Sequence, residues 1–284
     1  MKMKFLIRAS FFAIISMFAV VTNAKTSEQP PKPSELAPPL QSLSLEPICI
    51  DCGEPFDTSS HKELLDKLAK NIYLAELRHA LYFQDSIHQF ESKAHFDNCD
   101  FDSAITYIND LLNETNEHVQ QAQNQKEIAD KEIAMKKAYF SLGQAMHAVQ
   151  DFYAHSNFVE LTAPNAKRAD DLIIVEPWTS EGKELIAKLA EQKLVSGYVF
   201  WGFPQKCAKD SISHADLAKD SHDTKSGKVK IAHFQNQSQY KVAVFLARKT
   251  SIFLMEYAFK RWPLMKEMGG NEMAFEVLID RRGI

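Results

Sequence analysis

Apolar side chains recur every three or four residues along most of the chain after about residue 60. That spacing places them on one face of an α-helix. The chain also contains only 9 glycines, a low count for sheet-rich folds, which use glycine in their many turns. The sequence therefore predicts an all-α fold: a single helical bundle with a loop-rich insertion.

Four stretches carry the helical pattern, at residues 64–75, 105–112, 138–159 and 243–253, the last closed by Pro263. Residues 113–137 are polar on all sides, which predicts a solvated helix or a pair of helices. Residues 164–223 show only a loose pattern and are expected to be rich in loops. Within them, residues 194–200 are compatible with a short strand or with a helical turn.

The N-terminal residues have the organisation of a secretory signal peptide. Three basic residues precede an apolar run at 9–21, and Thr22-Asn23-Ala24 then supplies small residues for cleavage. The run is about 13 residues long, short of the roughly 20 that span a bilayer. We expect residues 1–24 to be removed after Ala24 and the mature protein to be secreted or periplasmic.

A proline-rich segment follows the signal peptide. Residues 25–48 hold six of the 11 prolines, and proline at this density prevents a helix, so we expect an extended linker. Residues 49–284 are then expected to form the all-α, metal-binding domain.

The charge balance excludes one class of partner. The formal net charge is −4, and loss of the basic signal peptide makes the mature chain more acidic. A protein that coats double-stranded nucleic acid needs a cationic surface, so we expect no such partner.

The four cysteines, Cys49, Cys52, Cys99 and Cys207, all lie in the exported part of the chain. An even number in an oxidising compartment favours two disulfides, and three pairings are possible. A redox pair or half of a zinc site at Cys49 and Cys52 is disfavoured, because the chain has no second Cys-x-x-Cys.

His147, Asp151 and His155 follow one another at intervals of four residues on a predicted helix. Their side chains therefore share one stripe, flanked by apolar residues. A histidine and an aspartate one turn apart can chelate a divalent cation. The two histidines lie about 12 Å apart along the helix axis, so the stripe favours two neighbouring ions with Asp151 close to both. The alternative is a polar stripe whose histidines bond neighbouring side chains.

A second polar cluster comprises His95, Asp97, Asp100 and Asp102. Such density suits a hard or borderline cation. Asp102 directly precedes an apolar-periodic run, and we assign it to helix capping. His95 and Asp97 are kept as candidate ligands.

Residues 142–161, which read LGQAMHAVQDFYAHSNFVEL, and residues 95–98, which read HFDN, resemble the two signatures of the Het-C-like proteins. That family in turn resembles the superfamily of zinc-dependent phospholipase C and single-strand nucleases, all-α enzymes with two or three zinc ions. The resemblance implies that the ligands of two zinc ions are His147, Asp151 and His155, completed by Asp97 or His95.

The resemblance also implies roles outside the two signatures. His61 stands where the superfamily often places a further ligand, and Asp220 ends a segment that is similar to one in the Het-C-like proteins. Asn157 and Glu160 are expected to support the ligands rather than to bind metal.

This sequence departs from the superfamily pattern in two places. The phospholipase branch binds one zinc through an N-terminal tryptophan, whereas the mature chain here is expected to begin at Lys25, so a third zinc is not expected. The superfamily also has a late histidine followed by a carboxylate one turn on. His214, His222 and His233 lack that carboxylate, and Tyr240 stands where the late helix carries histidine. These three histidines can also be read as exposed loop residues, a reading that we prefer for His222.

The predicted chemistry is hydrolysis of a phosphodiester, either a phospholipid or another phosphodiester such as single-stranded nucleic acid. Bound Zn²⁺ lowers the pKa of its water to about 7, and Asp97 or Asp151 is expected to act as the catalytic carboxylate that orients this water. No Gly-x-Ser-x-Gly motif is present, which disfavours a serine nucleophile.

Two alternatives remain open at this stage. One is a secreted binding or structural protein of the Het-C-like type that keeps the bundle without catalysis. The other is a membrane-active toxin, whose aromatic residues 198–203 would contact the membrane surface.

Overall fold

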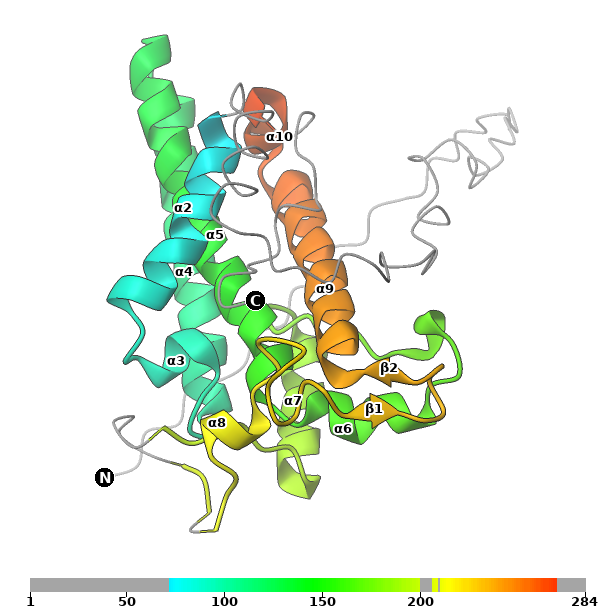
Figure 1. Cartoon of the computed structure of the whole chain (residues 1–284). Coiled ribbons are helices and arrows are strands. Elements are labelled where there is room, and N and C mark those ends of the chain that lie inside the picture. The colour runs from blue at the N-terminus through cyan, green and yellow to red at the C-terminus, as the bar shows by residue number, and fades with distance from the viewer. Residues whose placement is uncertain (1–71, 200–205, 209, 270–284) are drawn as a thin grey trace, which may run out of the picture. The chain divides into compact units, whose positions relative to one another are not determined.

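Helices account for most of the residues that the computed structural model describes, which are residues 72–199, 206–208 and 210–269 (Figure 1). The four long helices are α2 (Ile72–Ile87), α4 (Phe101–Asn124), α5 (Ile128–His155) and α9 (Gln239–Arg261). The shorter helices are α3 (Ser92–His95), α6 (Phe158–Thr162), α7 (Ser180–Gln192), α8 (His214–Leu217) and α10 (Pro263–Gly269). Strands β1 (Lys230–Ile231) and β2 (Gln237–Ser238) form one antiparallel hairpin. The predicted all-α bundle is confirmed.

Helix α5 is the centre of the bundle and packs against α2, α4 and α9. All ten residues from 141 to 150 are buried. A helix surrounded on every side by other helices needs no polar face, which explains why this stretch is apolar around most of its circumference. The polar side chains that α5 does carry in its last turns are therefore placed inside the protein.

Helices α4 and α5 form an antiparallel pair joined by a short turn after Asn124. The expectation of a helix pair at 113–137 is confirmed. The expectation that this stretch is polar on all sides is wrong, because Val119, Ala122 and Met135 are buried. These few apolar residues, separated by longer polar intervals, bury the contact between the two helices.

The N-cap of α4 is Asp100, whose side chain accepts a hydrogen bond from the Ser103 amide at 3.2 Å. Asp102, which the sequence assigned to capping, lies exposed in the first turn. The helix begins one residue after Asp100 because Phe101 is itself buried and opens the apolar stripe.

The stretch from 164 to 223 is rich in loops, as expected, but it also contains α7, which the loose pattern did not predict. Thr179 caps α7 by accepting a hydrogen bond from the Gly182 amide at 3.0 Å. Residues 194–199 form isolated bridges, in which Ser196 pairs with Ser156 and Tyr198 pairs with Ser213. Of the two structures expected for this segment, the short strand is therefore nearer to what is observed than the helical turn.

A disulfide joins Cys99, just before α4, to Cys207 in the long insertion. This is one of the pairings that the sequence left open. Cys49, Cys52, the signal peptide, the proline-rich linker, His61 and most of the first apolar stripe lie outside the described residues.

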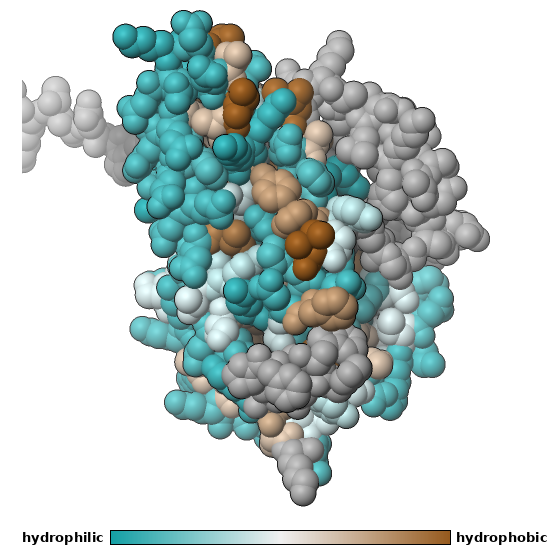
Figure 2. Space-filling view, turned by 90° about the vertical axis from the view of Figure 1, so that its left-hand side faces the viewer, coloured by the Kyte–Doolittle hydropathy of each residue, from teal (hydrophilic) through white to brown (hydrophobic). Residues whose placement is uncertain are grey.

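Hydrophilic residues dominate the face of the protein shown in Figure 2, and the apolar side chains on it are scattered in small spots. Ile87 and Phe90, at and just after the end of α2, are among the exposed large apolar residues. Among the helices that the structure describes, none is both long enough and apolar enough to cross a bilayer. Most of the aromatic stretch at 198–203 lies outside the described residues.

Candidate metal centre

The last turns of α5 carry His147, Asp151 and His155 on one stripe, as the spacing predicts. Both histidines are buried, and the Asp151 side chain is 14% exposed. Asp151 Oδ2 lies 3.0 Å from His147 Nε2 and 3.8 Å from His155 Nδ1. The carboxylate therefore stands between the two histidines and contacts groups on both sides.

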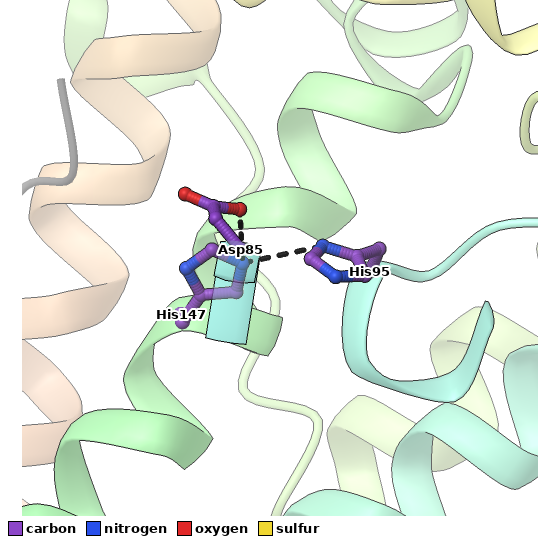
Figure 3. A group of neighbouring side chains, drawn as sticks. All are labelled: Asp85, His95 and His147. Carbon is purple, nitrogen blue, oxygen red and sulfur yellow. Dashed lines mark hydrogen bonds and ion pairs between the residues drawn. The ribbon is translucent and has the colours of Figure 1, made fainter. Parts of the chain in front are cut away.

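The first group of candidate ligands is Asp85, His95 and His147, which come from α2, α3 and α5. Figure 3 shows the Asp85 carboxylate and the His95 ring both turned toward the same nitrogen of His147. His147 Nε2 lies 3.4 Å from Asp85 Oδ1 and 3.3 Å from His95 Nδ1. Asp151 Oδ2 completes the set at 2.8 Å from His95 Nδ1.

These separations are compatible with ligands of one shared divalent cation. Ligands at about 2.0–2.1 Å from zinc in a tetrahedron are separated from one another by about 3.3 Å. The four measured separations in the first group run from 2.8 to 3.4 Å. The set contains two imidazoles and two carboxylates, which are ordinary ligands of Zn²⁺.

The second group is Asp97, His155 and His214, whose ligand atoms lie within 4.8 Å of one another. Asp97 Oδ1 lies 2.8 Å from His214 Nδ1. Asp220 joins this group, with Oδ1 at 3.0 Å from His155 Nε2 and Oδ2 at 3.9 Å from His214 Nε2. Two histidines and two carboxylates again converge.

Hydrogen bonds to backbone carbonyls fix the orientation of two of the histidines. His95 Nε2–H donates to the His88 carbonyl at 3.2 Å, and His155 Nδ1–H donates to the His95 carbonyl at 2.9 Å. A carbonyl can only accept, so these nitrogens carry the proton. The other nitrogen of each ring is then directed at a carboxylate, which is the arrangement of histidines that bind metal.

In a neutral ring that second nitrogen carries a lone pair, and it faces the lone pairs of a carboxylate oxygen. His95 Nδ1 faces Asp151 at 2.8 Å, and His155 Nε2 faces Asp220 at 3.0 Å. The contact is attractive only when a proton or a metal cation lies between the two atoms. The donor set therefore fits a divalent cation in each group.

The pKa shifts of His155 and Asp151 also indicate that the cluster can hold a cation. Burial disfavours the charged form of His155, but the charges of Asp151 and Asp220 outweigh burial and raise its pKa well above the ordinary value. Burial likewise opposes ionisation of Asp151, yet His147 and His155 hold its pKa well below the usual range. The cluster is therefore a site in which positive charge is strongly stabilised.

The segment that carries His95 and Asp97 has an unusual backbone. Phe96, Asn98 and Cys99 all have positive φ, between 54° and 60°, a conformation that costs non-glycine residues free energy and tends to occur at functional sites. Asn98 holds the turn with two hydrogen bonds. Its side-chain Oδ1 accepts from the Val199 amide at 2.8 Å, and its backbone N–H donates to the Gly197 carbonyl at 2.8 Å. The turn directs Asp97 toward His214.

The structure brings together six of the seven metal ligands expected from the sequence: His95, Asp97, His147, Asp151, His155 and Asp220. Asp97 and Asp151, the two carboxylates predicted to be catalytic, both contact histidines of the cluster. The seventh expected ligand, His61, lies outside the described residues.

Sequence reasoning missed Asp85 and left His214 undecided. The sequence does contain a sign of Asp85. It lies four residues after Leu81 and eight after Leu77, both buried, so a charged residue occupies the helix face that is otherwise apolar. His214 follows an irregular loop, and no periodic pattern marks it.

The two remaining late histidines and Tyr240 lie differently from His214. His222 and His233 are exposed, and the ring of Tyr240 lies 6.4 Å from that of His222. The exposed reading of His222 and His233 is therefore confirmed.

Asn157 and Glu160, the expected supporting residues, hold the chain around the second group. Asn157 Oδ1 accepts from the Val195 amide at 2.9 Å and Asn157 Nδ2 donates to the Lys193 carbonyl at 3.0 Å. Glu160 accepts a hydrogen bond from Lys219, which precedes Asp220, at 3.1 Å.

Comparison with known proteins gives one family match. Searches of curated proteins and of solved structures found no match. The matching family model names neither the Het-C-like proteins nor phospholipase C, so that relationship stays a prediction. The match spans the part of the chain that supplies Asp85, His95, Asp97, His147, Asp151 and His155, whereas His214 and Asp220 lie beyond it. Residues 48–178 are similar to the family described as the VWA7 N-terminal domain.

Proposed function

We propose that this protein is an exported zinc-dependent hydrolase of phosphodiesters, related to phospholipase C. The observation that carries the proposal is the convergence of four histidines and four aspartates into two adjacent groups, with Asp151 in the first group and 3.8 Å from His155 Nδ1 of the second. Four carboxylates balance the charge of two divalent cations, so the loaded cluster is neutral before an anionic substrate arrives.

The eight side chains differ in how far they are exposed to solvent. His95, His147, His155 and Asp97 are buried, so the protein fixes their positions, whereas the His214 side chain is 28% exposed. The side chains of Asp85 and Asp220 are 43% and 39% exposed, so these carboxylates lie where solvent and substrate reach the cluster. Zinc bound here would supply a hydroxide at neutral pH and would offset the charge that develops on a phosphodiester.

Among the carboxylates, Asp151 has the most contacts with the cluster. It lies 2.8 Å from His95 Nδ1 and 3.0 Å from His147 Nε2 in the first group, and 3.8 Å from His155 Nδ1 in the second. We therefore assign Asp151 to holding the metal ions, together with Asp97. Asp85 and Asp220 complete the two ligand sets and, as the more exposed carboxylates, lie on the side that an attacking water would reach.

The test is an assay of the zinc-loaded mature protein on two substrates, a chromogenic phosphorylcholine ester and a single-stranded oligonucleotide. Asp151→Asn keeps the size of the side chain and removes its charge, and we expect activity to fall by more than about a hundredfold. Asp110→Asn, the same change on the exposed face of α4, is the matched control and should leave activity unchanged.

The outcome on the two substrates separates the possible functions. Hydrolysis of the phosphorylcholine ester alone supports a phospholipase, and hydrolysis of the oligonucleotide alone supports a nuclease. Zinc binding without hydrolysis of either substrate contradicts the enzymatic proposal and favours the secreted binding protein.

A further inference from the structure

Lys219 is a buried lysine that lies between two residues of the second group. It follows α8, which begins with His214, and it directly precedes Asp220. Its side chain is 0% exposed, although lysine is among the residues least often fully buried. A charge in such a place needs partners and calls for an explanation.

The ammonium group of Lys219 uses all three of its donors. Nζ donates to the carbonyls of Ser156 at 2.8 Å and Leu217 at 3.0 Å, and to Glu160 Oε1 at 3.1 Å. The charge is balanced by Glu160, which also accepts a hydrogen bond from Ser226 at 2.8 Å. The lysine is therefore satisfied where it lies.

Two of the contacts of Lys219 bracket His155. Its backbone amide donates to the Ala154 carbonyl at 3.0 Å, while its side chain donates to the Ser156 carbonyl. The residue thus ties the loop of the second group to the end of α5 on both sides of the histidine. No other residue type offers three donors at the end of a stem of this length and flexibility.

Stability alone does not explain a lysine here. Replacing a buried ion pair with apolar side chains of similar size is often neutral or stabilising. The hydrogen bonds of Lys219 join the segment that supplies His214 and Asp220 to the end of α5, which supplies His155. His155 Nε2 and Asp220 Oδ1, which lie on the two segments joined in this way, are 3.0 Å apart.

We propose that Lys219 is a positioning residue for the second metal group, which fixes Asp220 and His214 against His155 so that the group can bind a divalent cation. The proposal rests on the function proposed above. It assigns Lys219 no contact with metal or substrate, and it predicts that its loss affects one group and leaves the other intact.

The experiment measures zinc affinity in two single-group backgrounds, by competition with a chromophoric chelator. Asp85→Ala removes a ligand of the first group only, and His214→Ala removes a ligand of the second group only. In the Asp85→Ala protein, adding Lys219→Met is expected to weaken zinc binding by about tenfold or more, the size typical of groups that orient metal ligands. In the His214→Ala protein, the same addition should leave the affinity unchanged.

Lys225→Met is the matched control. Lys225 lies in the same loop and pairs with Asp216 at 2.9 Å on the surface, so its replacement should not change zinc affinity in either background. Glu160→Gln is a second variant, chosen because it keeps an acceptor oxygen for Lys219 and removes only the charge. It should weaken zinc binding in the Asp85→Ala background alone, and it decides the question if Lys219→Met does not fold.

Equal losses of affinity in the two backgrounds, or no loss in the Asp85→Ala background, would overturn the positioning role. If neither parent variant binds zinc, the proposed function itself fails, which is a different result from a failure of Lys219. If only His214→Ala binds zinc, the second group is not a metal site, and the inference about Lys219 is wrong.

Discussion

At the scale of single residues, the turn from His95 to Asp100 shows how much local structure serves the cluster. Three residues there adopt left-handed backbone conformations. Asn98 holds them through hydrogen bonds with Gly197, Val199 and Lys206 of the insertion. Asp97 then faces the second group, while Asp100 begins α4. Periodicity cannot predict such a turn, because its geometry depends on contacts with residues about one hundred positions away.

Asp100→Ala tests the assignment of the helix cap. We expect a loss of about 1 kcal/mol in the free energy of unfolding at neutral pH. Asp102→Ala, an exposed change in the first turn, should cost less. Urea denaturation of the two variants measures both values, and a larger loss for Asp102→Ala would contradict the assignment.

The stabilisation by Asp100 also depends on pH. Burial opposes its ionisation, but hydrogen bonds from Lys206 and Ser103 outweigh burial and lower its pKa below the usual 3.8. A carboxyl group whose pKa is lowered in the folded state stabilises the protein at pH values above its pKa in the unfolded state. This contribution is lost as the pH falls through its pKa in the folded state. The difference between wild type and Asp100→Ala should therefore shrink below about pH 4. A difference that grows on acidification would refute this.

At the scale of helices, the position of α2 against α5 sets the first group, because Asp85 lies on α2 and His147 on α5. Gly143 permits the close contact. A Cβ atom at this position would lie 2.7 Å from Ala80 Cβ and 2.8 Å from the Leu77 carbonyl oxygen. The two helices would have to move apart, and Asp85 would move with α2.

Gly143→Ala should therefore destabilise the protein, although alanine is the better helix former by about 1 kcal/mol. Overpacking costs about 1–3 kcal/mol, so we expect a net loss and weaker zinc binding by the first group. Lys137→Ala, an exposed substitution on the same helix, should change stability by less than about 0.5 kcal/mol. Thermal unfolding measures both variants, and a more stable Gly143→Ala protein would mean that α2 and α5 are not in close contact.

At the scale of the whole molecule, the second group is assembled from segments that are distant in sequence. The Cys99–Cys207 disulfide, with a sequence separation of 108, joins the turn that carries Asp97 to the loop that leads to His214. Removing a native disulfide typically costs about 2–5 kcal/mol. The double variant Cys99→Ser, Cys207→Ser should lose stability in this range.

The same double variant should also bind zinc more weakly at the second group than at the first. The comparison uses the Asp85→Ala and His214→Ala backgrounds. A loss of affinity confined to the first group would show that the disulfide does not support the second.

The sequence predicts the parts of the fold and site that depend on local repetition. The stripe of His147, Asp151 and His155 is readable because all three lie on one long helix, and its length correctly implies two adjacent groups. Asp85 and His214 could not be placed with the same certainty. Their roles depend on which helices pack together and on how a loop closes, and neither leaves a periodic trace in the sequence.

The metal content of the purified mature protein tests the central claim most directly. After expression in the presence of zinc, elemental analysis by mass spectrometry should find about two zinc ions per chain. Asp85→Ala and His214→Ala should each retain about one. A wild-type content below one zinc per chain, or a content that neither substitution changes, would contradict the assignment of the two groups as zinc sites.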